Sequence, residues 1–185
     1  MNWRNSLDRY GAAAIALHWL MLLLLIAVYG CAELRGLFAR DSPEQEALRT
    51  WHYMLGLSVF TLVWLRLVVS WPGPTPDITP RPPFWQDRAA KAVHVLLYGL
   101  MIGLPLLGWL ALSTAGKPIP FYGAHLPALA SANKELARQV KDWHETLARA
   151  GYFVVGLHAA AALFHHYLLH DNTLTRMLPA RQANR

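Results

Sequence analysis

The sequence has little charge and almost no cysteine. Only 15% of its 185 residues are charged, whereas soluble domains usually carry about 25%. Its single cysteine, Cys31, cannot form an internal disulfide or a cluster of thiolate metal ligands. These shortages exclude a disulfide-stapled secreted fold, and they argue against a water-soluble globule.

Long apolar segments take the place of that charge. Hydrophobic residues make up 55% of the chain, and four segments reach the roughly 20 residues that a helix needs to cross a bilayer. Because lipid offers no hydrogen bonds to the backbone, segments of this kind fold as helices. The sequence therefore predicts an all-α, integral membrane four-helix bundle, a single domain over 1–185. We expect its helices at about 10–32, 50–71, 91–116 and 143–169.

The basic residues lie between these apolar segments. The formal net charge is +6, and its distribution indicates membrane-flanking charge rather than a surface for nucleic acid. Basic residues are almost equally frequent on the two sides of the predicted bundle, so the positive-inside rule does not set its orientation. An even number of crossings puts both termini on one side. The longest connection, 117–142, is expected to be a loop.

Histidine is the main ionisable residue within the predicted spans. Ionisable groups in a bilayer are costly, and they mark functional sites by default. The alternative is that each histidine simply hydrogen-bonds a neighbouring helix. The histidines within or at the ends of the predicted spans are His18, His52, His94, His144, His158, His165, His166 and His170.

The spacing of these histidines predicts two ligand pairs. His144 and His158 are 14 residues apart on the fourth predicted helix, which places them on one face about 21 Å apart. Because neighbouring helices alternate in direction, His52 lies level with His144 and His18 lies level with His158. Two bis-histidine sites stacked across a membrane are typical of two b-type haems.

The residue types favour haem over other metal centres. Bis-imidazole ligation leaves iron no open position, which favours electron transfer. A zinc site would need cysteine or carboxylate ligands in a tighter cluster, and covalent haem attachment would need a Cys-x-x-Cys-His motif that the sequence lacks. Gly151, Gly156 and the alanines at 159–162 would leave room for a porphyrin, although small residues also allow close helix packing.

Several short motifs lie in and after the first and fourth predicted helices. They are Leu17-His18-Trp19-Leu20, Trp143 to Leu147, Gly151-Tyr152-Phe153, Gly156 to Ala162, His165-His166-Tyr167 and Asp171 to Met177. These motifs resemble the bacterial cytochrome b561 family, and most closely its superoxide oxidase branch. The resemblance covers essentially the whole chain, and the motifs of the fourth helix are its most specific part.

The resemblance implies a di-haem bundle in the bacterial inner membrane with both termini cytoplasmic. It implies haem axial ligation by His18 with His158 and by His52 with His144. It also implies oxidation of superoxide at the periplasmic face, with electrons passing to ubiquinone and no protein partner required. We expect Lys117 to be a catalytic residue for the superoxide anion, although a lysine at a helix end is more often only an interfacial anchor.

Two further histidines are candidates for the ubiquinone site. His94 and His165 are expected near the haem between His18 and His158, and histidine titrates in the range that suits proton delivery to a quinone. A competing assignment makes His94 the ligand and His18 the structural residue.

Two other functions fit parts of this pattern. A cytochrome b subunit of a hydrogenase or formate dehydrogenase would have a similar four-histidine plan and would need a docking surface for its partner. A metal-ion transporter would also use intramembrane histidines, but it would be expected to line its path with carboxylates, and the predicted helices carry none at depth.

Overall fold

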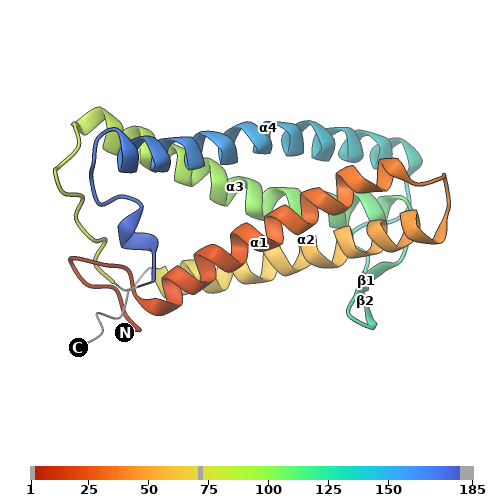
Figure 1. Ribbon diagram of the computed structural model, residues 1–185. Helices are drawn as coiled ribbons and strands as arrows, with labels where there is room; N and C mark the ends of the chain where they lie inside the picture. The colour runs from red at the N-terminus through yellow and green to blue at the C-terminus, as the bar shows by residue number, and fades with distance from the viewer. Residues whose placement is uncertain (1–2, 71–72, 180–185) are drawn as a thin grey trace.

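Four long helices make up most of the structure, a computed structural model that describes residues 3–70 and 73–179 (Figure 1). They are α1 (Ala12–Leu34), α2 (Pro43–Ser70), α3 (Phe84–Thr114) and α4 (Lys134–Tyr167). Each is long and apolar enough to cross a membrane. Successive helices run in opposite directions, so that the first and last described residues lie at one end, here called the terminal end. The opposite end, here called the hairpin end, holds the α1–α2 turn. The predicted four-helix membrane bundle is confirmed.

Three helices begin earlier than predicted. α2 begins at Pro43 rather than 50, because the Ser42 Oγ accepts a hydrogen bond from the Gln45 N–H at 3.2 Å and proline suits the first helical position. α4 begins at Lys134 rather than 143, because the Asn133 Oδ1 accepts from the Leu136 N–H at 3.0 Å. α3 begins at Phe84 rather than 91, directly after Pro83. Apolar composition had located the lipid-facing part of each helix and missed its polar first turns.

The remaining helix ends lie close to the predictions. α1 spans Ala12–Leu34 where 10–32 was expected, α3 ends at Thr114 rather than 116, and α4 ends at Tyr167 rather than 169. Residue 71, the predicted end of α2, lies outside the described residues. Two short 3₁₀ helices, η1 (Arg35–Leu37) and η2 (Thr175–Met177), follow α1 and α4.

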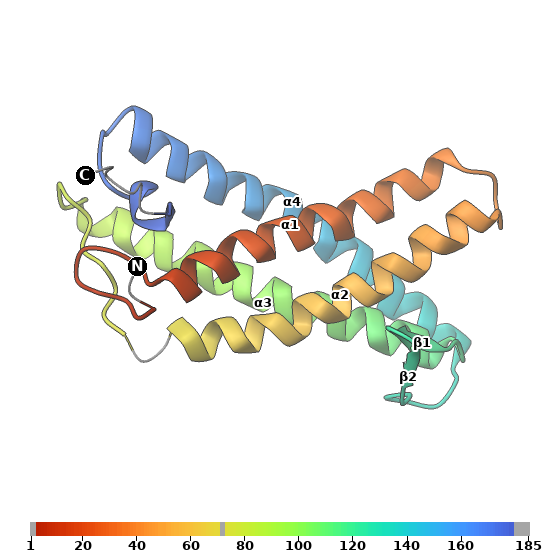
Figure 2. The ribbon, with the colours of Figure 1, turned by 60° about the horizontal axis from the view of Figure 1, so that its bottom comes forward.

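A small β-hairpin replaces part of the loop expected at 117–142. Strands β1 (Ile119–Phe121) and β2 (Ala124–Leu126) pair antiparallel. Tyr122 and Gly123 join them with φ angles of 46° and 87°, as a tight hairpin turn requires at both central positions. Ile119 packs on Leu57 and Leu112, so the hairpin lies against the middle of α2 and the end of α3 (Figure 2).

The bundle buries few side chains. Met21, Val59 and Val63 form the best-buried cluster, where α1 meets α2, with Met101 of α3 against it. Large apolar side chains instead point outward from every helix, among them Leu23, Trp64, Val95 and Phe153. An outward apolar surface on all four helices is what a bilayer requires.

Three irregular segments cover the terminal end. They are residues 3–11, 73–83 and 168–179, together called the terminal layer. The Trp19 indole N–H donates to the Met177 carbonyl at 2.8 Å, and the Arg9 guanidinium donates to the Leu178 carbonyl at 2.6 Å. The backbone N–H of Asp77 donates to the Leu7 carbonyl at 2.9 Å. The last described segment is therefore held against α1 and the N-terminal segment.

Candidate functional site

The structure brings His52 of α2 and His144 of α4 together at the hairpin end. Their ring centroids are 6.1 Å apart. The Nδ1 of His52 lies 3.0 Å from the Val28 carbonyl oxygen, and the Nδ1 of His144 lies 2.9 Å from that of Leu104. Because a carbonyl oxygen only accepts, each Nδ1 carries the proton and each Nε2 keeps its lone pair. A hydrogen bond of this kind fixes the tautomer and orientation of a metal-binding histidine.

The separation of the two rings fits a metal between them. Imidazole nitrogens bind metals at about 2.0–2.1 Å, which puts the centroids of two opposed imidazoles roughly 6 Å apart. Gly108 of α3 packs beside the His144 ring, since a Cβ added there would lie 3.4 Å from its Cε1. An alanine at 108 would make ordinary van der Waals contact with the ring, so α3 packs closely against His144 at this point.

A large cavity surrounds this pair. Its volume is about 1170 Å³, slightly above the range of roughly 300–1,000 Å³ usual for cofactor and ligand pockets. Gly56, one turn after His52, also lines the cavity, and no atom lies within 4 Å of where its Cβ would stand. Apolar walls, two imidazoles with free Nε2 atoms and a glycine facing open space fit a flat, bulky tetrapyrrole such as haem.

Positive charge gathers around the cavity. Lys117 lies at a fixed point of the wall, because the Lys117 and Gly116 N–H groups donate to the Leu112 and Ser113 carbonyls, both at 3.0 Å, and Gly116 has a φ of 67°. This is the Schellman ending of a helix. Lys134, at the start of α4, is not among the described residues that line the cavity. The basic residues that line the cavity are Arg35, Arg40, Arg49, Lys117, Arg138, Lys141 and Arg149.

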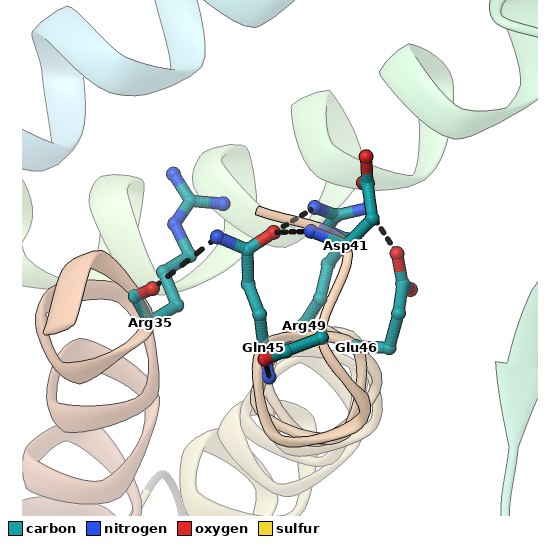
Figure 3. Close-up of polar contacts among 6 residues, drawn as sticks. Arg35, Asp41, Gln45, Glu46 and Arg49 are labelled. Atoms are coloured by element: carbon teal, nitrogen blue, oxygen red, sulfur yellow. Dashed lines mark hydrogen bonds and ion pairs between the residues drawn. The ribbon is translucent and has the colours of Figure 1, made fainter. Parts of the chain in front are cut away.

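Two of these arginines flank the α1–α2 turn, Arg35 in η1 and Arg49 in α2 (Figure 3). The Gln45 side chain bridges them, because its Nε2 donates to the Arg35 carbonyl at 3.4 Å and its Oε1 accepts from the Arg49 Nη2 at 3.0 Å. Glu46 accepts from the Arg49 Nη1 at 2.6 Å. The sequence alone predicts only that Arg35 and Arg49 are charges that flank the membrane.

The second pair, His18 of α1 and His158 of α4, lies nearer the terminal end. Their ring centroids are 6.2 Å apart, nearly the separation of the first pair. His94 of α3 is also adjacent, with its centroid 5.4 Å from that of His158. The buried Nδ1 of His18 has no hydrogen-bond partner among the described residues. Three imidazoles therefore meet here, and the protein does not fix the tautomer of His18.

Arg66 of α2 is a positive charge within the membrane-spanning part of the bundle, close to the second histidine pair. Its Nε donates to the Tyr98 hydroxyl at 3.1 Å, and it lies close enough to His18 and His158 to act on them electrostatically. An arginine inside a span is costly unless it meets an anion. Its position four residues before the end of α2 had made it look like an ordinary flanking residue.

His165 is held by a carboxylate at the end of α4. Its Nδ1 lies 2.5 Å from the Asp171 Oδ2. Burial raises the pKa of Asp171, but hydrogen bonds from His165 and from the Thr173 backbone outweigh that effect and hold the pKa below its usual range. Asp171 is therefore an anion at neutral pH.

Two tyrosines join α1 to α4 between the two histidine pairs. The Tyr29 hydroxyl donates to the Ala148 carbonyl at 2.9 Å, and the Tyr152 hydroxyl donates to Glu33 at 2.7 Å. Their rings are 4.3 Å apart. A Cβ at Gly151 would lie 2.4 Å from the Tyr29 hydroxyl, so this glycine permits the contact. No sequence motif predicts this pairing, since it depends on how two distant helices meet.

The fold and the paired imidazoles define an integral membrane four-helix bundle suited to a cofactor held between its helices. The family model "Prokaryotic cytochrome b561" matches residues 9–180. "Cytochrome b561 homolog 1" of Escherichia coli is 40% identical over 95% of this chain and 100% of its own length. "Probable superoxide oxidase CybB" of Yersinia pestis is 38% identical over 95% of this chain and 98% of its own length. The chain belongs to the prokaryotic cytochrome b561 family.

Membership establishes the general role. Proteins of this family are b-type haem cytochromes that transfer electrons, and the chain is accordingly a multi-pass bacterial membrane oxidoreductase. This confirms the family resemblance read from the motifs of α1 and α4. It also decides between electron transfer and metal-ion transport, in favour of electron transfer.

Proposed function

We propose that the chain holds two b-type haems and carries electrons from superoxide at the hairpin end to ubiquinone at the terminal end. The observation that carries the proposal is the repetition of one geometry. Two histidine pairs, each joining α4 to another helix, have ring centroids 6.1 and 6.2 Å apart. The α4 members of the pairs lie about 21 Å apart along the helix, one toward each leaflet.

His18 is the better partner for His158 than His94. The 6.2 Å separation of His18 from His158 suits two imidazoles on opposite sides of one metal, whereas the 5.4 Å separation of His94 from His158 is short for that arrangement. A haem bound by each pair supplies a one-electron carrier with no open iron position. His94 then remains free for a second ligand at this end.

The cationic cavity supports superoxide as the electron donor. Superoxide is a small anion, and a cleft lined with positive charge raises the local concentration of an anionic substrate. Lys117, Arg35, Arg40 and Arg149 make no ion pair with any described residue, whereas Arg49, Arg138 and Lys141 are paired with glutamates. Lys117 therefore offers its full charge at the wall of the cavity, and we assign it the catalytic role of holding the anion. The name of the Yersinia pestis relative points to the same substrate.

The terminal end supports a quinone as the acceptor. Two superoxide ions give up two electrons and leave as oxygen, and one ubiquinone takes two electrons and two protons to become the quinol. His94 and His165 are the proposed ubiquinone-binding residues, because imidazole can donate a hydrogen bond to a quinone oxygen and release a proton. Protons are then taken from the terminal end, which we assign to the cytoplasm together with both termini.

The test is haem content followed by two half-reactions on the purified protein. We expect two b-type haems per chain, reduction of both by a superoxide source, and reoxidation by a short-chain ubiquinone. Two haems that superoxide does not reduce would instead support a subunit fed by a hydrogenase or formate dehydrogenase partner. A single haem would refute the two-pair assignment.

A further inference from the structure

The pair His165–Asp171 is unlike the other ion pairs of the described residues. Its two side chains are 16% and 3% exposed, whereas the other four pairs join neighbours on helix surfaces. A buried carboxylate is costly unless it is paired and hydrogen-bonded. Packing alone does not require a charged residue here, yet the chain has the carboxylate of Asp171 at this position.

The backbone after α4 fixes the position of the carboxylate. His170 has a φ of 54°, which reverses the chain, and the Asp171 N–H then donates back to the His165 carbonyl at 3.1 Å. The Asp171 Oδ1 accepts from the Thr173 N–H at 2.8 Å, which leaves Oδ2 for His165. The two oxygens of Asp171 thus have separate partners, and only one of them is a side chain.

The next residues tie this turn to the terminal layer. The Asn172 Oδ1 accepts from the Thr79 N–H at 2.9 Å, and the Asn172 amide donates to the Asp77 carbonyl at 3.2 Å. Arg176 donates to the Pro76 carbonyl. The turn that carries Asp171 is consequently held against one distant segment, 76–79, and the Thr173 N–H holds the Oδ1 of Asp171 independently of His165.

The hydrogen bond to Asp171 determines which ring nitrogen of His165 is available to a ligand. Because the carboxylate is ionised, the Nδ1 carries the proton that it donates to Asp171, and the Nε2 is the atom left for a ligand. His165 lies seven residues beyond His158, about 10 Å farther along α4 and within roughly 20° of the same face. The Nε2 is therefore carried by the same helix face as a proposed haem ligand, toward the terminal end.

We propose that Asp171 is a positioning residue that makes His165 the proton donor to the quinone. This inference rests on the quinone half of the proposed function. As an electron reaches the quinone, the Nε2–H bond of protonated His165 breaks and the proton passes to a quinone oxygen. Neutral His165 then takes a proton from water at the terminal end. Asp171 stays ionised throughout and keeps its hydrogen bond with the His165 Nδ1–H.

The test compares two electron acceptors: ubiquinone, which takes up protons when it is reduced, and ferricyanide, which does not. The haem of the purified holoprotein is reduced chemically and mixed rapidly with a short-chain ubiquinone or with ferricyanide. The variants are Asp171→Asn, which keeps the shape of the side chain, His165→Gln, and the two together. Asp87→Asn is the matched control, since Asp87 belongs to an exposed pair with Lys91 at the same end of the bundle.

We expect Asp171→Asn to slow reoxidation by quinone roughly ten- to a hundredfold, less than the 10²–10⁴-fold typical of a general acid itself, because Asp171 acts through His165. Haem content and the ferricyanide rate are expected to stay at the wild-type level. The double variant is expected to be no slower than His165→Gln alone, because Asp171 acts through His165. Asp171→Glu is expected to restore part of the rate, and Asp87→Asn is expected to change neither rate.

Other results overturn the inference. An unchanged quinone rate in Asp171→Asn, equal slowing with both acceptors, loss of haem, or additive effects in the double variant would each do so. If quinone does not reoxidise the haem of the wild type, the quinone half of the proposed function is overturned and this inference with it. If quinone reoxidises that haem but superoxide does not reduce it, only the superoxide half is overturned. The comparison of the Asp171 variants then still tests this inference.

Discussion

The two histidine pairs have nearly the same separation but very different surroundings. At the hairpin end, both Nδ1 atoms are held by backbone carbonyls, and the pair opens into a large cavity with basic residues around it. At the terminal end, the Nδ1 of His18 has no partner among the described residues, and a third imidazole, His94, stands beside the pair.

This difference shows that the spacing of each histidine pair and the access of small molecules to it are separate features of this bundle. A small anion needs attraction and an open path, which the hairpin end offers. A quinone needs an apolar approach and a source of protons, and the terminal end has additional histidines, one of them held by Asp171.

The largest effect is expected from loss of a ligand at the hairpin end. His52→Ala should lower the haem content from two to one per chain and bring superoxide-driven reduction to background, because the donor then meets no haem at its own end. Haem is counted by absorbance after extraction. His125→Ala, a change in β2 away from both pairs, is the control. Two haems retained in His52→Ala would contradict the assignment.

A large but selective effect is expected from His94→Ala. This variant should keep both haems and reduce quickly with superoxide, whereas reoxidation by ubiquinone should slow by about tenfold or more because a hydrogen-bond donor is lost. Stopped-flow spectra of the reduced protein mixed with quinone measure this step. Loss of one haem would show that His94, rather than His18, is the ligand.

A smaller, salt-dependent effect is expected from Lys117→Glu. Reversing one charge at the cavity wall should slow superoxide-driven reduction roughly two- to tenfold at low ionic strength, and the difference should shrink as salt screens the field. Haem content should not change. Lys134→Glu is the control, since Lys134 is also at this end of the bundle but lies outside the cavity lining. Equal effects of the two variants would remove Lys117 from the site.

The smallest effect is expected at the contact between α1 and α4. In Gly151→Ala the new Cβ would clash with the Tyr29 hydroxyl, which must move from the Ala148 carbonyl. The expected loss is about 1–3 kcal/mol of stability, measured by thermal unfolding in detergent. Gly30→Ala is the control, because no atom lies within 4 Å of its Cβ position. Equal melting temperatures for the two variants would show that the tyrosine contact carries no stability.

Much of the fold followed from the sequence, because a bilayer leaves few choices. Apolar runs between Arg9 and Glu33 or between Arg149 and Asp171 have to be helices, and their number sets the topology. The early starts of α2 and α4 were missed because they depend on caps at Ser42 and Asn133. The hairpin was missed because three-residue strands leave almost no periodic signal.

The site was predictable where it depends on depth along a helix. The spacing of His144 and His158 and the alternation of helix direction predicted which histidines meet, and the structure brings those pairs together. Contacts made by irregular segments were beyond the sequence. Asp171 reaches His165 only because the chain reverses at His170, and Gln45 reaches the Arg35 carbonyl only through the shape of the α1–α2 turn (Figure 3).

The central claim is that electrons enter at one histidine pair and leave at the other. The most direct measurement follows the haem spectrum of the purified protein while a superoxide source and then ubiquinone are added, in the wild type and in His94→Ala. We expect two b-type haems per chain in both proteins, and superoxide should reduce both haems in each. Quinone should reoxidise the haems quickly in the wild type and slowly in His94→Ala. A variant in which superoxide reduction slows and quinone reoxidation does not would contradict it.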